Sequence, residues 1–315
     1  MRIDKVDSER GHVETNYFSI LNPFTGEFKE FGTPRNSHHF TCGFGYDSSI
    51  YDYKLVAISD NDGCSNIDVY TVKSDSLNSI KGTVNYSFGI TGKRSHGVFF
   101  NGALHWLGSK STQKTSSEVV VCFDTSSETM LNMSLPENIM PPKGFCGHVY
   151  KNLGVWGDCI CVAFAYDLVR LDVWVMQRYR VKDSWFKKYT TTRLPWSSHE
   201  IPFWKPLLCF DSGVILLDTG GKELLLFDPT TERVRSVVVR DITAMYSNRE
   251  SYFETIASLG STTYLERQIT DETVKNPKRQ RFSYNTALVN NESKMNRNEL
   301  LGYLSSKTFE AFYVI

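Results

Sequence analysis

The chain has 315 residues, of which 41% are apolar and 13% aromatic, so it can build a large core. Its 35 basic and 35 acidic residues cancel, which argues against nucleic-acid binding, since that requires a basic face to neutralise phosphates. The apolar runs are too short to span a membrane, no secretory signal follows the N-terminus, and the seven cysteines are odd in number and scattered. We therefore expect a reducing cytoplasmic or nuclear setting, with no membrane partner.

A short β-type run recurs with a period of roughly 51 residues, a spacing typical of β-propellers, in which each repeat is one four-stranded blade. The runs end at Leu21, Tyr70, Phe123, Trp174 and Phe227. A β-sandwich, the alternative all-β fold, would show frequent turns but no such superperiod. The recurrence therefore favours an all-β, kelch-like propeller.

An apolar hairpin with a tight turn lies between successive runs. The turns are predicted at 47–52, Asn101-Gly102, Gly157-Asp158 and 211–213. Asn-Gly is the strongest of these cues, because both turn positions need a positive φ. Each repeat then contains strands A and B from the hairpin, strand C from the recurring run and strand D after a short polar turn. The predicted D strands are 27–31, 77–80, 129–135, 185–190 and 233–239.

This pattern gives four complete blades and a partial first blade that has only strands C and D. A late strand at 252–259 is expected to close the ring by pairing with the N-terminal hairpin, although the count leaves open whether the ring is complete. The propeller domain is predicted at 17–260, after a polar segment at 1–16 and before a loosely ordered tail at 261–315.

Short A–B and C–D turns should lie on one rim of the propeller, and the longer B–C and D–A loops on the other. The predicted D–A loops are 32–40, 81–96, 136–147 and 191–206. Long loops on a rigid scaffold usually carry binding residues, so the long-loop rim is the expected working face.

The ordered motifs resemble the plant F-box-associated interaction domain. They include Asn22-Pro23-Phe24-Thr25-Gly26-Glu27, Gly43-Phe44-Gly45-Tyr46-Asp47, Asn101-Gly102-Ala103-Leu104-His105-Trp106, Val173-Trp174-Val175-Met176, Asp183-Ser184-Trp185 and Phe227-Asp228-Pro229. The resemblance implies a kelch-like propeller that captures a target protein, while an N-terminal F-box couples it to an SCF-type ubiquitin ligase. Here the F-box and the first A–B hairpin are missing before residue 17, so we expect the SCF adaptor as a partner only if an F-box is supplied elsewhere.

Aromatic residues in the long loops are the candidates for contacting a target protein. Trp196, Phe203 and Trp204 lie in one D–A loop, and Phe145 in another. In the alternative interpretation, one or two of these rings plug the channel or cover a blade edge. His38 and His39 could ligate a metal ion or sense pH, but adjacent residues in an extended chain point apart, which favours a solvated loop pair. Both histidines are assigned to the same candidate face.

The sequence predicts no enzyme, cofactor or metal site. No nucleophile or phosphate-loop motif is present, and Cys159 and Cys161 lack ligand partners at metal-site spacing. The leading hypothesis is a protein-interaction module that acts as an orphan adaptor, a decoy or an inactive product. The alternatives are a carbohydrate-binding propeller and, less favoured, a propeller enzyme. The basic cluster at 275–281 predicts nuclear import as an addition to a cytoplasmic location.

Overall fold

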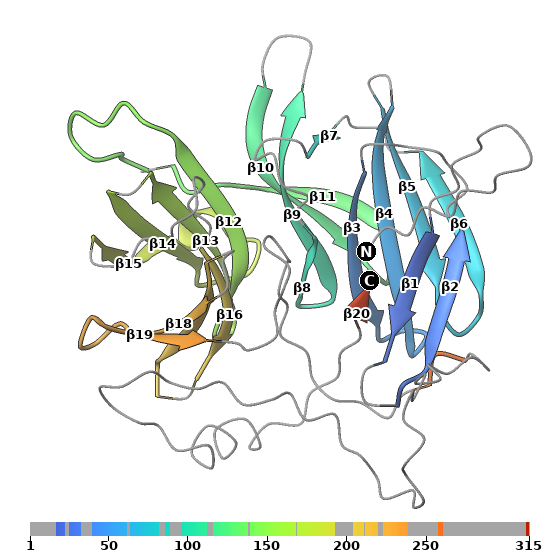
Figure 1. Ribbon diagram of the computed structural model, residues 1–315. Coiled ribbons are helices and arrows are strands. Elements are labelled where there is room, and N and C mark those ends of the chain that lie inside the picture. Colours follow the sequence, from blue (N-terminus) through green and yellow to red (C-terminus); the bar gives the residue numbers. More distant parts are fainter. Residues whose placement is uncertain are drawn as a thin grey trace, which may run out of the picture.

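The computed structural model describes residues 17–22, 25–32, 40–61, 64–81, 86–88, 96–111, 116–137, 139–167, 169–192, 204–210, 212–219, 223–238, 258–260 and 313–314. Within these ranges the chain is almost entirely β, and a short 3-10 turn, η1 (Lys182–Ser184), is the only helical element. The strands form five antiparallel sheets, which follow one another in chain order about a common centre (Figure 1).

The sheets are the blades of a propeller. Blade 1 holds β1 (Tyr17–Leu21) and β2 (Phe28–Gly32), joined by β20 (Tyr313–Val314). Blade 2 holds β3 (Phe40–Asp47), β4 (Asp52–Asn61), β5 (Cys64–Thr71) and β6 (Ser76–Lys81). Blade 3 holds β8 (Val98–Phe100), β9 (Ala103–Ser111), β10 (Ser116–Asp124) and β11 (Thr129–Ser134), with β7 (Tyr86–Ser87) beside β9. Blade 4 holds β12 (Val149–Trp156), β13 (Cys159–Tyr166), β14 (Arg170–Met176) and β15 (Trp185–Thr191). Blade 5 holds β16 (Lys205–Cys209), β17 (Ile215–Asp218), β18 (Glu223–Asp228) and β19 (Arg233–Val238).

The architecture confirms the predicted all-β propeller with four complete blades and a partial first one. The five outer strands β2, β6, β11, β15 and β19 begin and end within one residue of the predicted D strands. The recurring runs correspond to the third strand of each complete blade and to β1 of blade 1. The period in the sequence is therefore the repeat of the blade.

The tight turns form through the backbone preferences and side-chain hydrogen bonds of their own residues, as the sequence predicted. Asn101 and Gly102 both adopt positive φ, 48° and 74°, in the two-residue turn between β8 and β9. At the C–D turns of blades 3 and 5, the carboxylates of Asp124 and Asp228 accept hydrogen bonds from backbone amides two and three residues on. These Asx turns reverse the chain without using strand hydrogen bonds.

Neighbouring blades approach closely through glycine on their inner strands. Gly43 of β3 pairs with Gly97, just before β8, and the Gly97 amide donates to Cys42 O at 2.7 Å. Trp106, 1% exposed, lies against both glycines and donates from Nε1 to Cys42 O at 3.1 Å. A Cβ at Gly97 would lie 2.5 Å from Trp106 Cε2, so this approach requires glycine.

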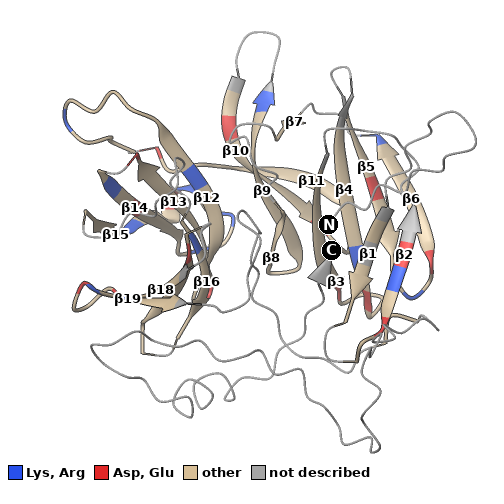
Figure 2. Ribbon diagram, in the orientation of Figure 1, with Lys and Arg blue, Asp and Glu red and all other residues tan. Residues whose placement is uncertain are grey.

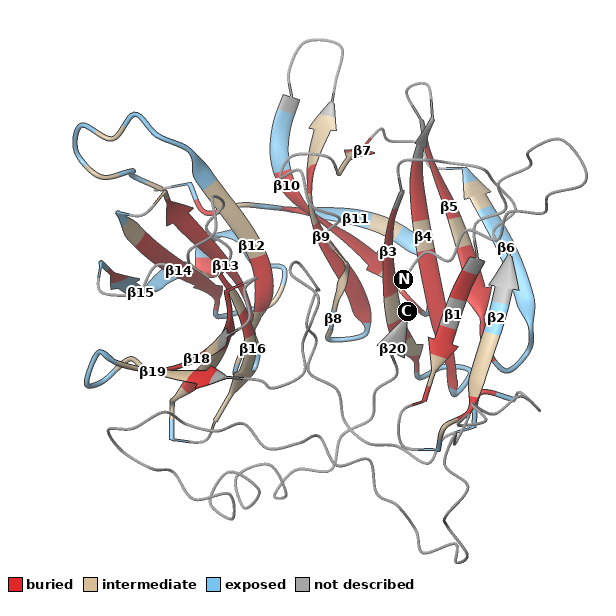
Figure 3. Ribbon diagram, in the orientation of Figure 1, coloured by how far each residue is buried: buried red, intermediate tan, exposed pale blue. Residues whose placement is uncertain are grey.

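The hydrophobic core lies between the blades. Buried residues line the inner strands, whereas exposed residues gather on the outer strands β6 and β11 (Figure 3). Between blades 4 and 5, for example, Ala163 and Val173 share one cluster with Ile215 and Phe227. Each blade therefore buries its faces against its neighbours, as a propeller requires.

The end of the predicted late strand lies against the N-terminal hairpin. Glu27, which is buried, accepts hydrogen bonds from the Ser258 hydroxyl and the Leu259 amide, both at 2.9 Å. Leu259 is fully buried in a cluster that contains Phe18 and Ile20. Residues 252–257 of this predicted strand, the segment 1–16 and the tail at 261–315 apart from β20 lie outside the described residues.

Candidate partner-binding face

The residues predicted for the binding face are placed unevenly by the structure. His38, His39, Trp196 and Phe203 lie outside the described residues. Trp204 is 2% exposed and packs in the core between blades 4 and 5. This corrects the prediction of a partner contact at Trp204, because its indole is covered by the blades and fills the packing role that the alternative interpretation gave it.

The loop 135–148, which links β11 to β12, is the long D–A connection that the structure describes most fully. The Arg170 guanidinium donates to Met140 O. The His148 amide donates to Asp167 Oδ2 at 3.0 Å, and the Asp167 amide returns a bond of 3.0 Å to His148 O. The start of β14 therefore holds the middle of the loop, and the β13–β14 turn holds its last residue.

Phe145 anchors the middle of this loop. Its ring packs edge-on against Tyr166, with the centroids 5.6 Å apart, and the Arg170 guanidinium lies 4.5 Å from the Tyr166 ring centroid. Gly144 has a φ of 75° in a turn closed by a 2.9 Å bond from the Phe145 amide to Pro142 O. Phe145 is half-buried, so it supports the predicted face more than it projects from it.

Three apolar side chains, on this loop, at the start of β12 and in the β13–β14 turn, are exposed to solvent. Met140 is 74% exposed, Val169 49% and Val149 37%. We call Met140, Phe145, Val149 and Val169 the blade 4 platform. Met140, Val149 and Val169 were not among the predicted site residues, although the Ile-Met-Pro-Pro run at 139–142 in a long loop is a signal for an exposed apolar side chain.

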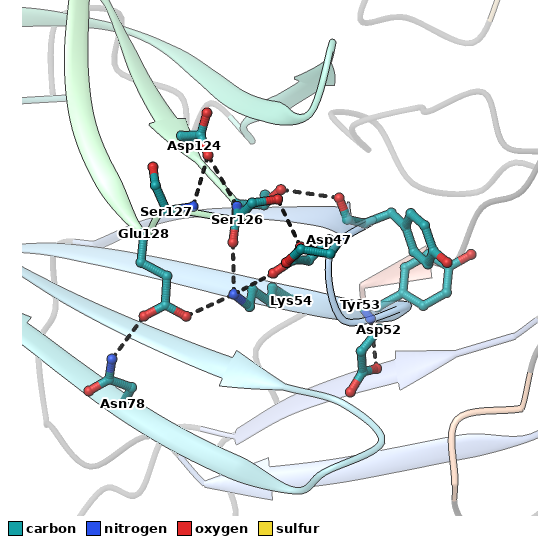
Figure 4. Close-up of polar contacts among 12 residues, drawn as sticks. Asp47, Asp52, Tyr53, Lys54, Asn78, Asp124, Ser126, Ser127 and Glu128 are labelled. Atoms are coloured by element: carbon teal, nitrogen blue, oxygen red, sulfur yellow. Dashed lines mark hydrogen bonds and ion pairs between the residues drawn. The ribbon is translucent and has the colours of Figure 1, made fainter.

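The opposite rim carries a buried ionic cluster between blades 2 and 3. The Lys54 ammonium contacts Asp47 Oδ2 at 2.8 Å, Glu128 Oε1 at 2.9 Å and Thr125 O at 2.7 Å (Figure 4). The side chains of Lys54 and Asp47 are 5% and 1% exposed. Glu128 also accepts a hydrogen bond from Asn78 at 2.9 Å, so the C–D turn of blade 3 is tied to two strands of blade 2.

These contacts keep the cluster ionised. Burial opposes the charge on Asp47, but the hydrogen bonds from Lys54, Ser49 and Ser126 outweigh it and hold the pKa of Asp47 well below its ordinary value. Burial likewise opposes the charge on Lys54, whereas Asp47 and Glu128 raise the pKa of its ammonium. Buried groups paired in this way join the blades rather than perform proton transfer.

A similar tie joins blades 1 and 2. Lys29 contacts Val72 O at 2.7 Å and Asp75 at 3.0 Å. Asp75 and Glu128 occupy the same left-handed position at the end of a C–D turn, each with a φ of 52°. An acidic residue replaces the usual glycine there, and its ion pair to the preceding blade offsets the backbone strain.

Glu128 should therefore respond differently to glycine and to alanine. Both substitutions remove the contact with Lys54, but glycine also removes the strain, so we expect Glu128→Ala to be less stable than Glu128→Gly by about 1 kcal/mol. Urea denaturation measures the difference through the midpoint at constant slope. Equal stabilities, or a more stable alanine variant, would contradict the proposed strain at this position.

Comparison with known families agrees with this geometry. The family model described as the F-box associated beta propeller domain matches residues 12–289. The chain belongs to this family. The resemblance inferred from the hairpin and turn motifs is thereby confirmed for the F-box associated propeller.

Curated relatives of this F-box associated propeller are F-box proteins of Arabidopsis thaliana. F-box protein CPR1 is 26% identical over 65% of this chain and 53% of its own length, and F-box protein At4g22390 is 25% identical over 59% and 49%. The chain thus spans about half the length of these two relatives. F-box protein At3g07870 is 25% identical over 75% of this chain and 66% of its own. The solved structure of uncharacterized protein lmo1340 from Listeria monocytogenes EGD-e covers 79% of this chain and 81% of its own at 10% identity, with a TM-score of 0.39, too low to carry an argument.

Two titratable side chains elsewhere in this F-box associated propeller, His105 and Cys161, are packed into the blades. His105 is fully buried, bonds to Val98 O at 3.1 Å and Tyr179 at 2.8 Å, and burial lowers its pKa to about 4. Burial raises the pKa of the Cys161 thiol.

Over the part of the chain that the structure describes, no three potential ligands gather to hold a metal ion, and no helix is long and apolar enough to cross a membrane. Charges of both signs are dispersed over the blades (Figure 2).

Proposed function

We propose that this propeller is a target-recognition module and that it captures a protein on its long-loop rim through the blade 4 platform. The observation that carries the proposal is Met140, which is 74% exposed on a loop that Arg170 and Asp167 hold in place. An apolar side chain on a pre-ordered loop loses little conformational freedom on binding, which favours it as an anchor.

The target would be presented to an SCF-type ubiquitin ligase by an F-box. The names of the Arabidopsis relatives support this coupling, and the family's propeller domain supports a non-enzymatic role. The module would then recognise its target without transforming it, and the adaptor and cullin would join only through the F-box. A cytoplasmic or nuclear location fits this role, and the basic cluster at 275–281, outside the described residues, is the candidate import signal.

Affinity purification tests both parts of the proposal. The tagged chain and the same chain fused to an F-box are purified from plant cells, and the recovered proteins are quantified by mass spectrometry. We expect the same target with both, and the adaptor and cullin only with the fusion. Adaptor recovered with the unfused chain would contradict the requirement for a supplied F-box.

Variants on the platform then locate the target site. The double substitution Met140→Ser and Val169→Ser should reduce target recovery about ten-fold or more, because truncating an interface anchor costs at least about 1–2 kcal/mol. Leu77→Ser is the matched control, since Leu77 is 47% exposed on the outer strand β6 of blade 2. Equal target recovery by the double variant and the control would reject the platform.

A further inference from the structure

The turn between β3 and β4 exposes two large apolar residues on the rim opposite the blade 4 platform. Ile50 is 51% exposed and Tyr51 73%. The turn leaves the end of an inner strand, whereas the loop 135–148 leads into the start of one, so the two features lie at opposite ends of the propeller. Among the large apolar residues that the structure describes, only Met140 is as exposed as Tyr51.

Tyr51 holds a backbone conformation that bulky residues avoid. Its φ is 55°, in the left-handed region. At the other A–B turns of the complete blades, the left-handed positions that the structure describes belong to Asn101, Gly102, Gly157 and Gly213. Among these A–B turns a tyrosine at such a position is therefore the exception, and it invites a functional explanation.

Packing does not supply that explanation. The left-handed acidic residues Asp75 and Glu128 form ion pairs to the preceding blade. The ring of Tyr51, by contrast, makes no side-chain contact of this kind within the described part of the chain, and most of its surface faces solvent. Among the described residues, the ring therefore makes no contact that offsets this strain.

Hydrogen bonds nevertheless hold the turn at both of its ends. Asp47 accepts hydrogen bonds from the Ser49 amide at 2.9 Å and the Ser49 hydroxyl at 2.6 Å. Asp52, at the other end, accepts from the Lys73 amide at 3.1 Å, and the Lys73 ammonium donates to Tyr51 O at 3.0 Å. Both ends are fixed by carboxylates, so the exposed pair is held in place before any partner arrives.

We propose that Ile50 and Tyr51 form a second interaction site that inserts into an apolar pocket, edged by carboxylates, on a partner protein. Tyrosine is a frequent binding anchor because it gives a large contact area at little entropic cost. Lys73 is exposed beside the pair and forms no ion pair among the described residues, so a partner carboxylate would complement it.

A second copy of the chain is a poor occupant for this site. A stable interface buries about 800 Å² per partner, more than the symmetric contact of two small turn tips provides. A pocket that surrounds both side chains fits better. This site goes beyond the proposed target capture and does not depend on it.

The decisive variant is Tyr51→Gly, because glycine removes the strain together with the ring. We expect its melting temperature to equal that of the wild type or to rise by up to about 4 °C.

A yeast two-hybrid library of cDNA fragments is screened with the full chain, and each interacting fragment is retested against Tyr51→Gly, Ile50→Ser, Lys73→Glu and Met140→Ser. We expect one group of fragments to lose binding about ten-fold or more with the first three variants and to keep it with Met140→Ser.

Recovery of an interacting fragment from the screen does not by itself support the proposal. The supporting result is a charge swap, in which a carboxylate-to-lysine change in such a fragment restores its binding to Lys73→Glu. Fragments that all bind Tyr51→Gly as well as the wild type would overturn the site, and so would a screen without any fragment that depends on Tyr51. Dependence on Tyr51 without any effect of Lys73→Glu would overturn the acidic pocket. Fragments that all lose binding with Met140→Ser alone would overturn this site and support the blade 4 platform of the proposed function.

Discussion

Replacing Lys54 by methionine is expected to lower the free energy of unfolding by about 3–5 kcal/mol, because the buried Asp47 carboxylate loses its cation. Methionine keeps the length of the side chain, so the cost reflects charge more than volume. Urea denaturation followed by tryptophan fluorescence measures it. Lys188→Met is the matched control, since Lys188 is exposed on β15 and forms no ion pair among the described residues, and it should cost less than about 0.5 kcal/mol. Similar small losses in both variants would contradict a buried ionic tie.

The same pair predicts a dependence of stability on pH. The folded pKa of Asp47 lies below its ordinary value of 3.8, because the hydrogen bonds from Lys54, Ser49 and Ser126 outweigh the opposing effect of burial. A carboxylate with a depressed pKa stabilises the fold above its unfolded pKa, and this stability is lost as pH falls through the folded value. Wild type should therefore lose stability below about pH 4 more steeply than Lys54→Met does. Parallel curves of unfolding free energy against pH would contradict the assignment.

The strands of this propeller were predictable because their signals are local. Asn101 and Gly102 specify a turn through their own backbone preferences, and the carboxylate of Asp124 closes the next turn with amides two and three residues away. Apolar runs at Tyr70 and Phe123 mark the third strands of blades 2 and 3. Such signals need no knowledge of the neighbouring blade, so element type and boundary followed from the residues themselves.

The candidate site was less predictable because it depends on contacts between distant residues. Trp204 looks like an exposed loop aromatic in the sequence, but the blade 4 strands cover it. Lys54 reads as a polar strand residue, yet it is buried against Thr125 O, 71 residues away. The exposure of Met140 depends on Arg170, which fixes its loop from another strand. Sequence pattern gives the type of such side chains, but the tertiary packing decides which of them face solvent.

Trp106→Ala is expected to cost about 3–5 kcal/mol of unfolding free energy, because it opens a cavity where blades 2 and 3 meet. Trp106 packs against Gly43 and Gly97 and lies 6.3 Å, centroid to centroid, from the ring of Phe88. Leu131→Ala, an apolar truncation at an exposed position, should cost less than about 1 kcal/mol. A loss for Trp106→Ala as small as that control would mean that the contact between these blades does not depend on the indole.

Gly97→Ala tests whether the indole and the glycine form one unit. A Cβ at Gly97 would lie 2.5 Å from Trp106 Cε2, so this substitution should destabilise the wild type by about 1–3 kcal/mol through overpacking. In the Trp106→Ala background the added methyl group enters the space left by the ring, and the cost should vanish or change sign. The double-mutant cycle should therefore give a coupling energy of about 1–3 kcal/mol. Additive effects would show that another contact, such as the 2.7 Å hydrogen bond from the Gly97 amide to Cys42 O, sets the tolerance for side chains at this position.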